Sequence, residues 1–313
     1  MDYVTLGEDG PKVSEIGLGM WQAGGTAWGA DVTDEGCLAA IRRAHELGVT
    51  LIDTAEGYGG GHSEEVVGRG IREIGRDNVV LATKIMAPHT RAEYVERACD
   101  GSLKRLGVHE IDIYQIHWPD PWDQASLKKT MKALEKLHKA GKIRHIGVSN
   151  FAVRDLEEAR GALSNVDIVE NQIHWSLLHR TVEDEVVQYC AKEGIAVLPW
   201  SPLEKGILAG KYDAGNKPTD EVRKGSRMLK DANLAESAKL VAVLHEVGAK
   251  HGKTPAQVAL NWLMRQPGTV VPIPGAKSAS QAGENAGAAG WKLTPAEVRR
   301  ITDAATALRL DLF

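Results

Sequence analysis

The chain has 313 residues, of which 43% are hydrophobic and 26% are charged, and its formal net charge is −4. These proportions are ordinary for a globular protein, and the length suffices for two average domains or one large α/β barrel. The mild negative charge and the scattered basic residues argue against a nucleic-acid partner. No apolar stretch approaches the ~20 residues that span a bilayer, so no membrane association is expected.

The cysteines and the N-terminal residues bear on the cellular compartment. Cys37, Cys99 and Cys190 lie far apart in the sequence and have no metal-ligand spacing. Their odd number and separation suit a reducing environment better than a disulfide framework. The chain begins without a basic segment followed by an apolar run, so no signal peptide is predicted. We therefore expect a cytoplasmic protein.

A hairpin is predicted before the first long apolar segment. Residues 4–6 and 12–14 flank the turn-rich sequence Gly-Glu-Asp-Gly-Pro at 7–11. Two short strands joined by such a turn are typical of a β-hairpin. We expect this hairpin to close the bottom of a barrel.

Eight short apolar segments rich in isoleucine and valine recur along the chain, and segments with helical periodicity lie between them. Most of them lack polar alternation, which is typical of parallel strands covered by helices. The predicted strands span residues 16–20, 50–53, 79–84, 111–117, 143–148, 168–172, 195–200 and 270–273. Eight strand–helix units in about 300 residues predict an α/β fold of one domain over residues 1–313, a single (β/α)₈ TIM barrel.

Several intervening segments carry clear helix signals. Residues 127–137 place leucine and methionine at steps of four, three and three, and residues 236–250 carry a second apolar stripe. The sequences Thr-Pro-Ala-Gln at 254–257 and Thr-Pro-Ala-Glu at 294–297 each predict a helix start with threonine at the N-cap and proline at the first position.

A doubly wound open sheet is the competing architecture. No Gly-x-Gly-x-x-Gly follows a predicted strand, because Gly-Leu-Gly at 17–19 continues as Met-Trp-Gln. Polar candidates instead follow the carboxyl ends of several strands, where barrels build active sites, whereas an open sheet concentrates its site at one switch point. The barrel is therefore the favoured fold.

Residues 203–234 follow the seventh predicted strand and show little periodicity. Irregular connections of this length in a compact domain are usually functional or disordered. We expect this long loop to form a flexible cover over the site.

Four residues near strand ends can together move a proton onto a carbonyl oxygen: Asp53, Tyr58, Lys84 and His117. A tyrosine with a pKa near ~10 is a poor acid at neutral pH unless a neighbouring cation stabilises its phenolate. Lys84 can supply that cation, and Asp53 can hold the lysine in place. Singly, each residue is better explained as a turn, surface or partly buried residue, but their joint placement predicts a catalytic site.

These residues belong to a series of motifs that together resemble the aldo-keto reductases, from the N-terminal hairpin to the loop after the last strand. The motifs are Leu-Ile-Asp-Thr-Ala at 51–55 with Tyr58, Thr-Lys at 83–84, Gln-Ile-His-Trp at 115–118, Gly-Val-Ser-Asn at 147–150, Asn-Gln at 171–172, Trp-Ser-Pro-Leu at 200–203, Ile-Pro-Gly at 273–275 and Glu-Asn at 284–285. The resemblance implies NAD(P)H-dependent reduction of an aldehyde or ketone, with an extended cofactor held by loops.

The resemblance also implies a role for each catalytic residue. Tyr58 is the proton donor, Lys84 lowers its pKa, and Asp53 anchors the lysine. His117 donates a hydrogen bond to the carbonyl oxygen and stabilises negative charge there. The substrate pocket implied around them comprises Trp21, Trp28, Tyr58, Met86, His117 and Trp118.

An NADP cofactor is expected from the same resemblance. Trp200 would stack on the nicotinamide ring, and Lys277 would pair with a 2′-phosphate. Gln281 stands where many NADP-preferring relatives carry arginine, so NAD remains an alternative. The implied cofactor-binding residues are Gly19, Met20, Trp21, Asp53, Ser149, Asn150, Gln172, Trp200, Ser201, Pro202, Leu203, Lys205, Gly206, Leu208, Ile273, Gly275, Lys277, Gln281, Glu284 and Asn285.

Other functions stay open from the sequence. The same site working in reverse would oxidise a sugar or another secondary alcohol with NAD(P)⁺. A cofactor-binding regulatory subunit resembling the potassium-channel β-subunits would also keep these residues. His174 and His179 lack a third ligand at a zinc-like spacing, so no metal site is predicted. A small-molecule substrate is the expected partner, and no oligomer is evident.

Overall fold

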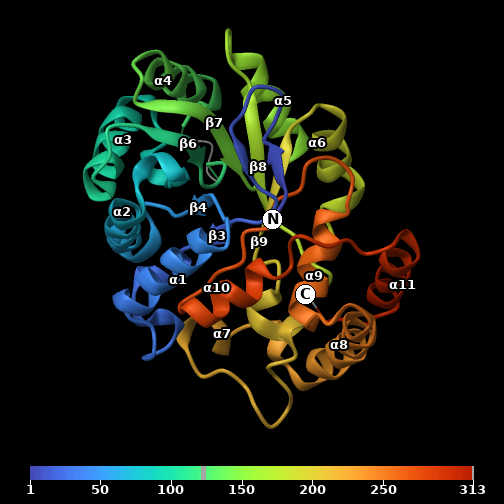
Figure 1. Ribbon diagram of the computed structural model, residues 1–313. Coiled ribbons are helices and arrows are strands. Elements are labelled where there is room, and N and C mark those ends of the chain that lie inside the picture. The colour runs from blue at the N-terminus through green and yellow to red at the C-terminus, as the bar shows by residue number, and fades with distance from the viewer. Residues whose placement is uncertain (121–124, 312–313) are drawn as a thin grey trace.

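Seven parallel strands follow one another in chain order around the centre of the molecule, and helices surround them (Figure 1). The computed structural model describes residues 1–120 and 125–311. Each parallel strand pairs with the next one in the sequence, from β3 to β9. The strands are β1 (Tyr3–Thr5), β2 (Lys12–Ser14), β3 (Leu18–Gly19), β4 (Leu51–Asp53), β5 (Val80–Ile85), β6 (Ile111–Ile116), β7 (Ile143–Ser149), β8 (Ile168–His174) and β9 (Ala196–Trp200).

The helices alternate with the strands through most of the chain and follow one another after β9. They are α1 (Asp34–Glu46), α2 (His62–Ile74), α3 (Ala92–Leu106), α4 (Leu127–Lys139), α5 (Val153–Ala162), α6 (Gln188–Lys192), α7 (Glu221–Lys224), α8 (Asp231–His251), α9 (Pro255–Met264), α10 (Ala279–Ala286) and α11 (Pro295–Thr306). Among the described residues, no helix combines the length and the apolar character that crossing a bilayer requires.

The eighth predicted strand, residues 270–273, closes the ring without forming a continuous ladder. The N–H groups of Val271 and Ile273 donate to the carbonyls of Val197 and Pro199 on β9. On the other side, the carbonyl of Pro272 accepts from Gly17, and that of Pro274 accepts from Gly19. Both prolines face β3 and have no N–H to give it, so only half of that ladder forms. The (β/α)₈ barrel is confirmed, and the pairing between this segment and β3 is incomplete.

The predicted hairpin is confirmed and closes one end of the barrel. Strands β1 and β2 pair antiparallel, and Leu6 and Val13 pack with the inward-facing side chains near the starts of the barrel strands. These partners include Leu51, Ala82 and Ile113. Because this end is filled by apolar side chains, the opposite end, where the strands finish, is left for polar groups.

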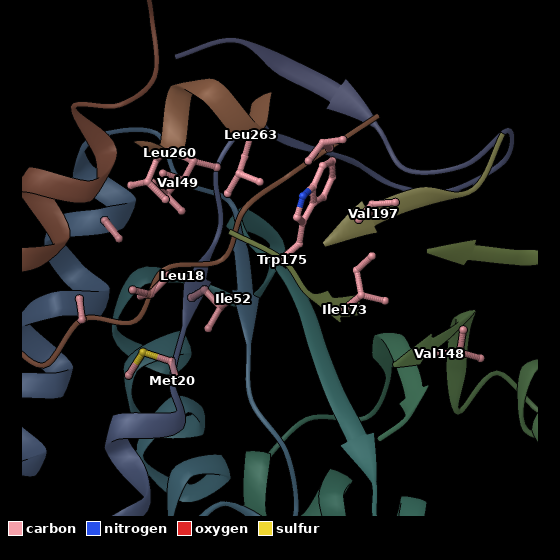
Figure 2. Close-up of a cluster of buried hydrophobic side chains, with 14 of the residues drawn as sticks. Leu18, Met20, Val49, Ile52, Val148, Ile173, Trp175, Val197, Leu260 and Leu263 are labelled. Carbon is pink, nitrogen blue, oxygen red and sulfur yellow. The ribbon is translucent and has the colours of Figure 1, made fainter. Parts of the chain in front are cut away.

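A second, larger core fills the space between the strands and the surrounding helices (Figure 2). Ile52 and Val148 point outward from their strands into it, as alternation along a strand requires. Trp262 on α9 is completely buried here. Cys37, Cys99 and Cys190 are buried and free.

The helix signals are confirmed with one difference. Threonine caps with proline at the first position begin α9 and α11, and both make capping boxes. The apolar residues of the 127–137 stripe pack inward from α4. Helix α8 begins at Asp231, inside the stretch predicted to be irregular. Its N-cap residue is Lys230, whose side chain has no acceptor and makes no cap hydrogen bond, so the sequence carries no capping signal there.

Candidate active site

The site lies where the barrel strands end. Successive inward-facing residues on a strand lie two apart, so β4 presents Leu51 to the hairpin core and then Asp53 to the open end. Strand β5 presents Ala82 and then Lys84. On β8, Val169 packs into the hairpin core, and the register shift against β7 at this residue offsets the alternation by one position, so that Gln172 also faces inward and bonds to Asp53. The sequence of each strand thus changes from apolar to polar at the end where the catalytic groups are predicted.

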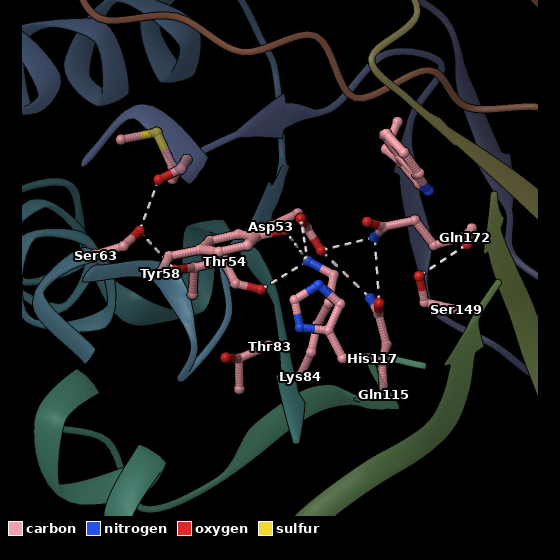
Figure 3. Close-up of polar contacts among 12 residues, drawn as sticks. Asp53, Thr54, Tyr58, Ser63, Thr83, Lys84, Gln115, His117, Ser149 and Gln172 are labelled. Carbon is pink, nitrogen blue, oxygen red and sulfur yellow. Dashed lines mark hydrogen bonds and ion pairs between the residues drawn. The ribbon is translucent and has the colours of Figure 1, made fainter. Parts of the chain in front are cut away.

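Lys84 joins Asp53 and Tyr58 into one cluster (Figure 3). Its ammonium donates to Asp53 Oδ1 at 2.6 Å, to the carbonyl of Thr54 at 2.8 Å and to Tyr58 Oη at 3.2 Å. An ammonium has three donors and no acceptor, so these contacts use its whole capacity. The phenol oxygen therefore accepts from Lys84, and its own O–H remains available for another acceptor.

Asp53 is held by two amides on its other oxygen. Gln172 Nε2 donates to Asp53 Oδ2 at 2.9 Å, and Gln115 Nε2 lies 3.4 Å from the same atom. Gln172 Nε2 also lies 3.2 Å from Gln115 Oε1. All three side chains are buried. The carboxylate that anchors Lys84 is thereby held by Lys84 and by two glutamine amides from other strands of the barrel.

Burial raises the pKa of Tyr58 above its ordinary value, and Asp53 adds to this effect. The charge of Lys84 and its hydrogen bond act in the opposite direction but do not outweigh burial. Lys84 does act to lower the pKa of Tyr58, as expected, but the pKa of Tyr58 as a whole is raised. Burial also opposes the charge of Lys84, but Asp53 and Tyr58 outweigh it and raise the pKa of the lysine. At neutral pH the cluster thus holds a protonated phenol and a charged ammonium.

His117 follows the end of β6 and faces Tyr58. The two ring centroids lie 5.5 Å apart, with the planes at 82°. Burial, with the nearby charge of Lys84, lowers the pKa of His117 to about 3. The imidazole is therefore neutral at physiological pH and has one N–H to donate to an oxygen bound beside Tyr58.

A glycine-rich turn presents Tyr58 to the cavity. Gly59 and Gly60 have φ angles of 61° and 64°, in the left-handed region that favours glycine. A Cβ on Gly59 would lie 2.1 Å from the carbonyl oxygen of Gly24, so the turn packs directly against the backbone after β3. These glycines therefore allow the tight turn that places Tyr58 at the cavity.

Residues after β7 and β9 form a second polar group. Asn150 has a φ of 62° and donates through Nδ2 to the carbonyl of His117 at 3.0 Å. Trp200 Nε1 donates to Asn150 Oδ1 at 3.0 Å, and Ser149 Oγ donates to the carbonyl of Gln172 at 2.9 Å. A non-glycine residue in the left-handed region costs about 1 to 2 kcal/mol. In this conformation Asn150, which follows β7, makes hydrogen bonds to His117 after β6 and to Trp200 at the end of β9.

A cavity of about 810 Å³ runs from this cluster across the open end of the barrel. Volumes of this size are typical of small-molecule and cofactor sites. The predicted site residues that line it are Gly19, Trp21, Trp28, Asp53, Tyr58, Met86, His117, Trp118, Ser149, Asn150, Gln172, Trp200, Ser201, Pro202, Leu203, Lys205, Gly206, Ile273, Gly275, Lys277, Gln281, Glu284 and Asn285. Three predicted residues do not line it: Lys84, Met20 and Leu208. Lys84 lies behind Tyr58, and the other two are buried in the outer core.

Aromatic side chains form the wall beside Tyr58. The rings of Trp21 and Trp28 meet edge to face at 4.8 Å, and Trp21 stacks on Tyr58 at 5.9 Å. Trp118 lies 6.5 Å from Trp200 on the other side. Trp118 is 48% exposed, whereas Trp28 is 6% exposed. Aromatic side chains of the predicted substrate pocket therefore line the cavity beside Tyr58.

At the far end of the cavity, Lys277 makes an ion pair that the sequence did not predict. Its ammonium lies 2.7 and 2.6 Å from the two carboxylate oxygens of Asp31. Its backbone N–H donates to Gln281 Oε1 at 3.0 Å, and Asn285 Nδ2 donates to the carbonyl of Gly275 at 3.2 Å. The cation predicted to hold a 2′-phosphate thus already has an anionic partner.

Several lining residues were missed by sequence reasoning. Gln22, Asp31, Tyr212 and Arg223 line the cavity and come from loops and short helical turns whose sequence has no periodic signal. Gln115 does not line it but supports Asp53. Its position, two residues before His117 on the same strand, was a signal that could have placed it inward.

Comparison with known proteins agrees with this geometry. Residues 15–306 match the profile described as the aldo/keto reductase family. The aldo-keto reductase YhdN of Bacillus subtilis (strain 168) is 35% identical over 96% of this chain and 92% of its own length. The crystal structure of an aldo-keto reductase from Klebsiella pneumoniae with NADPH is 31% identical, with a TM-score of 0.77 and complete coverage of both chains. The glycerol dehydrogenase structure from Gluconobacter oxydans has 30% identity and a TM-score of 0.86, covering 97% of this chain and 94% of its own. The chain therefore belongs to the aldo/keto reductase family.

Proposed function

We propose that this protein is an NADP-dependent carbonyl reductase that reduces an aldehyde or ketone to the alcohol. The observation that carries the proposal is the position of the Tyr58 phenol, which faces the cavity while Lys84 donates to its oxygen at 3.2 Å. A proton donor in this position can deliver its proton to a carbonyl oxygen. The ammonium then stabilises the phenolate that remains.

The other residues support this transfer. The neutral His117 donates a hydrogen bond that orients the carbonyl oxygen and stabilises the charge that develops on it. Asp53, fixed by Gln172, holds Lys84 at the phenol. The aromatic wall excludes water from the reacting carbonyl. Bound NADPH would supply the hydride.

The residues present fit such a cofactor. The cavity is lined by polar side chains at Ser149 and Asn150 and by the cationic side chain of Lys277. Within the described chain, Gln22 Oε1 and Trp28 Nε1 are buried without a hydrogen-bond partner, and both side chains line this cavity. Buried polar atoms of this kind usually have a partner, so these two atoms are consistent with a polar ligand in the cavity. NADPH is the ligand named for the Klebsiella relative.

Oxidation of an alcohol by the same site is the second candidate. The similarity to a glycerol dehydrogenase from Gluconobacter oxydans supports it, because the same phenol can take back the proton that it gives. We place the enzyme in the cytoplasm, since its three cysteines are free and buried.

A substrate panel tests the proposal. Aldehydes, ketones, sugars and alcohols are offered with NADPH, NADH and their oxidised forms, and nicotinamide absorbance is followed in both directions. The proposal predicts carbonyl-dependent oxidation of NADPH that exceeds the rate with NADH. Turnover with alcohols and NAD(P)⁺ only would favour the dehydrogenase, and no turnover with any pair would contradict both candidates.

A further inference from the structure

A stack of three rings lies behind the cavity wall at Trp200. The ring of His174, at the end of β8, lies parallel to Trp200 with centroids 4.2 Å apart and planes at 14°. His179 stacks on His174 in the same way, at 3.9 Å and 13°. Trp200 lines the cavity, whereas neither histidine does. The ring of Trp200 therefore packs against His174 on one face and also lines the cavity.

The same histidine is bonded to the loop that follows β9. His174 Nε2 and Glu204 Oε1 lie 2.7 Å apart, and Ser176 Oγ donates to the same oxygen at 2.8 Å. Glu204 is 5% exposed. A buried carboxylate needs such partners, because an unpaired one is strongly unfavourable. His174 and Ser176 thus fix Glu204 beneath the loop.

The loop that Glu204 belongs to has an unusual backbone. Ser201, Glu204 and Lys205 have φ angles of 49°, 45° and 55°, and they are three of the four non-glycine residues with positive φ in the described chain. Gly206 follows with a φ of 104°. Such conformations persist only where surrounding contacts hold them, and they cluster at ligand sites. The residues beside Glu204, including Leu203, Lys205 and Gly206, line the cavity.

We propose that His174 is a positioning residue for the dinucleotide cofactor, acting through two neighbours. Through Glu204 it holds residues 201–206, most of which line the cavity and which include implied cofactor-binding residues, in the conformation that we assign to binding the pyrophosphate. Through its ring it holds Trp200 at the angle that receives the nicotinamide. The inference rests on the proposed function, since it presumes a dinucleotide in this cavity. It adds a residue that contacts neither cofactor nor substrate.

A metal site does not explain the two histidines. No group of three or more metal-ligating side chains occurs in the described part of the chain. The rings of His174 and His179 lie face to face, and their Nε2 atoms are within hydrogen-bond distance of Glu204 and Thr181 respectively. Besides His179, His174 contacts the ring of Trp200, which lines the cavity, and the carboxylate of Glu204, whose neighbours Leu203 and Lys205 line it.

Two substitutions of His174 separate its two contacts. His174→Phe keeps a ring behind Trp200 but has no donor for Glu204. His174→Gln keeps a donor near the position of Nε2 but has no ring. His179→Phe is the matched control, because it alters the outer ring of the stack and leaves the bond to Glu204 intact. Calorimetry measures binding of ADP-ribose, which carries the pyrophosphate without nicotinamide, and of NADPH and NADH.

The expected results differ between the variants. His174→Phe weakens ADP-ribose, NADPH and NADH by a similar factor, about tenfold or more, because a buried hydrogen bond to a charged group is lost. His174→Gln binds ADP-ribose as the wild type does, which rescues the loop, but binds NADPH several-fold more weakly. His179→Phe stays within about twofold for every ligand, since it makes no bond to a charged group in this cluster.

Other outcomes overturn the inference. If both His174 variants bind all ligands as the wild type does, His174 positions nothing. If His179→Phe loses as much affinity as His174→Phe, the effect is general packing and the inference is wrong. Ser176→Ala gives a second test of the loop should His174→Phe fail to fold, and unchanged ADP-ribose affinity in that variant would contradict the role of Glu204. Failure of the wild type to bind any dinucleotide would instead overturn the proposed function itself.

Discussion

The protonation of Tyr58 follows from competition between two effects on one oxygen atom. Burial and Asp53 raise the pKa of the phenol, and Lys84 opposes them through its charge and its hydrogen bond. A donor must hold its proton until the acceptor arrives, so the raised pKa suits reduction. The contact with Lys84 stabilises the phenolate only after the proton has left. Sequence reasoning identified both residues but not which effect prevails, because the extent of burial depends on the whole barrel.

The ion pair between Lys277 and Asp31 offers a test of whether the protein prefers NADPH to NADH. We expect Lys277→Ala to weaken NADPH binding by roughly 10- to 100-fold, the range for a lost hydrogen bond to a charged group, and to leave NADH binding nearly unchanged. Asp31→Asn should have the opposite effect on NADPH, since the pair with Asp31 competes with a 2′-phosphate for the ammonium. Fluorescence titration with both cofactors measures each effect. Equal losses for NADPH and NADH in Lys277→Ala would refute the 2′-phosphate assignment.

The strand β7 shows how closely the barrel interior is filled beneath the site. A Cβ on Gly147 would lie 1.8 Å from Glu170 Oε1 and 2.9 Å from Gln115 Cγ. We expect Gly147→Ala to lower the free energy of unfolding by about 1 to 3 kcal/mol, as overpacked cores do. Urea unfolding at fixed pH measures the change.

Gly161 in α5 supplies the control for this substitution. Nothing lies within 4 Å of a Cβ placed there, so Gly161→Ala should be neutral or stabilise by about 0.4 to 1 kcal/mol. A Gly147→Ala protein as stable as the wild type would show that Glu170 has room to move.

The strands were predicted well and the connections less well, for identifiable reasons. Apolar runs rich in isoleucine and valine located β4 to β9 within a few residues, since burial on both faces imposes that composition. The segment at 270–273 met the same criterion, but Pro272 and Pro274 limit its pairing with β3. Helix α8 begins at Asp231 because tertiary packing extends it beyond its periodic part.

Two buried groups give the folded protein opposing responses to pH. Burial raises the pKa of Glu170 well above its usual value, and the nearby Asp53 adds to this. Above pH 4.5 the unfolded chain releases this proton while the folded protein keeps it, so stability falls as pH rises. The lowered pKa of His117 acts in the other direction, since stability is lost as pH falls from 6.5 toward about 3.

Glu170→Gln isolates the first of these responses. The variant cannot titrate, so its free energy of unfolding should exceed that of the wild type by a margin that grows by about 1.4 kcal/mol per pH unit above pH 4.5. His117 is present in both proteins and cancels in the difference. Urea unfolding at pH 5 and pH 7 measures the margin, with the exposed Glu158→Gln as control. A margin that does not change with pH would show that Glu170 is ionised in the folded protein.

The parts of the site that lie on strands were predictable, and the parts that depend on loops were not. Asp53 and Lys84 face inward at the strand ends because alternation along a strand fixes their direction, whereas Gln172 faces inward after the register shift at Val169 on β8. The pair between Asp31 and Lys277 joins residues 246 positions apart in the sequence, and no local pattern encodes it. Contacts of this kind arise from how loops cross the open end of the barrel.

The central claim is that the phenol of Tyr58 gives the proton to the substrate. Tyr58→Phe removes only that hydroxyl, and Tyr114→Phe removes another buried hydroxyl that lies outside the cavity. The decisive measurement is carbonyl-dependent NADPH oxidation by both variants beside NADPH binding followed by fluorescence. We predict that Tyr58→Phe loses nearly all turnover while binding NADPH with close to wild-type affinity, and that Tyr114→Phe remains active. Full activity in Tyr58→Phe would contradict the assignment of Tyr58 as the acid.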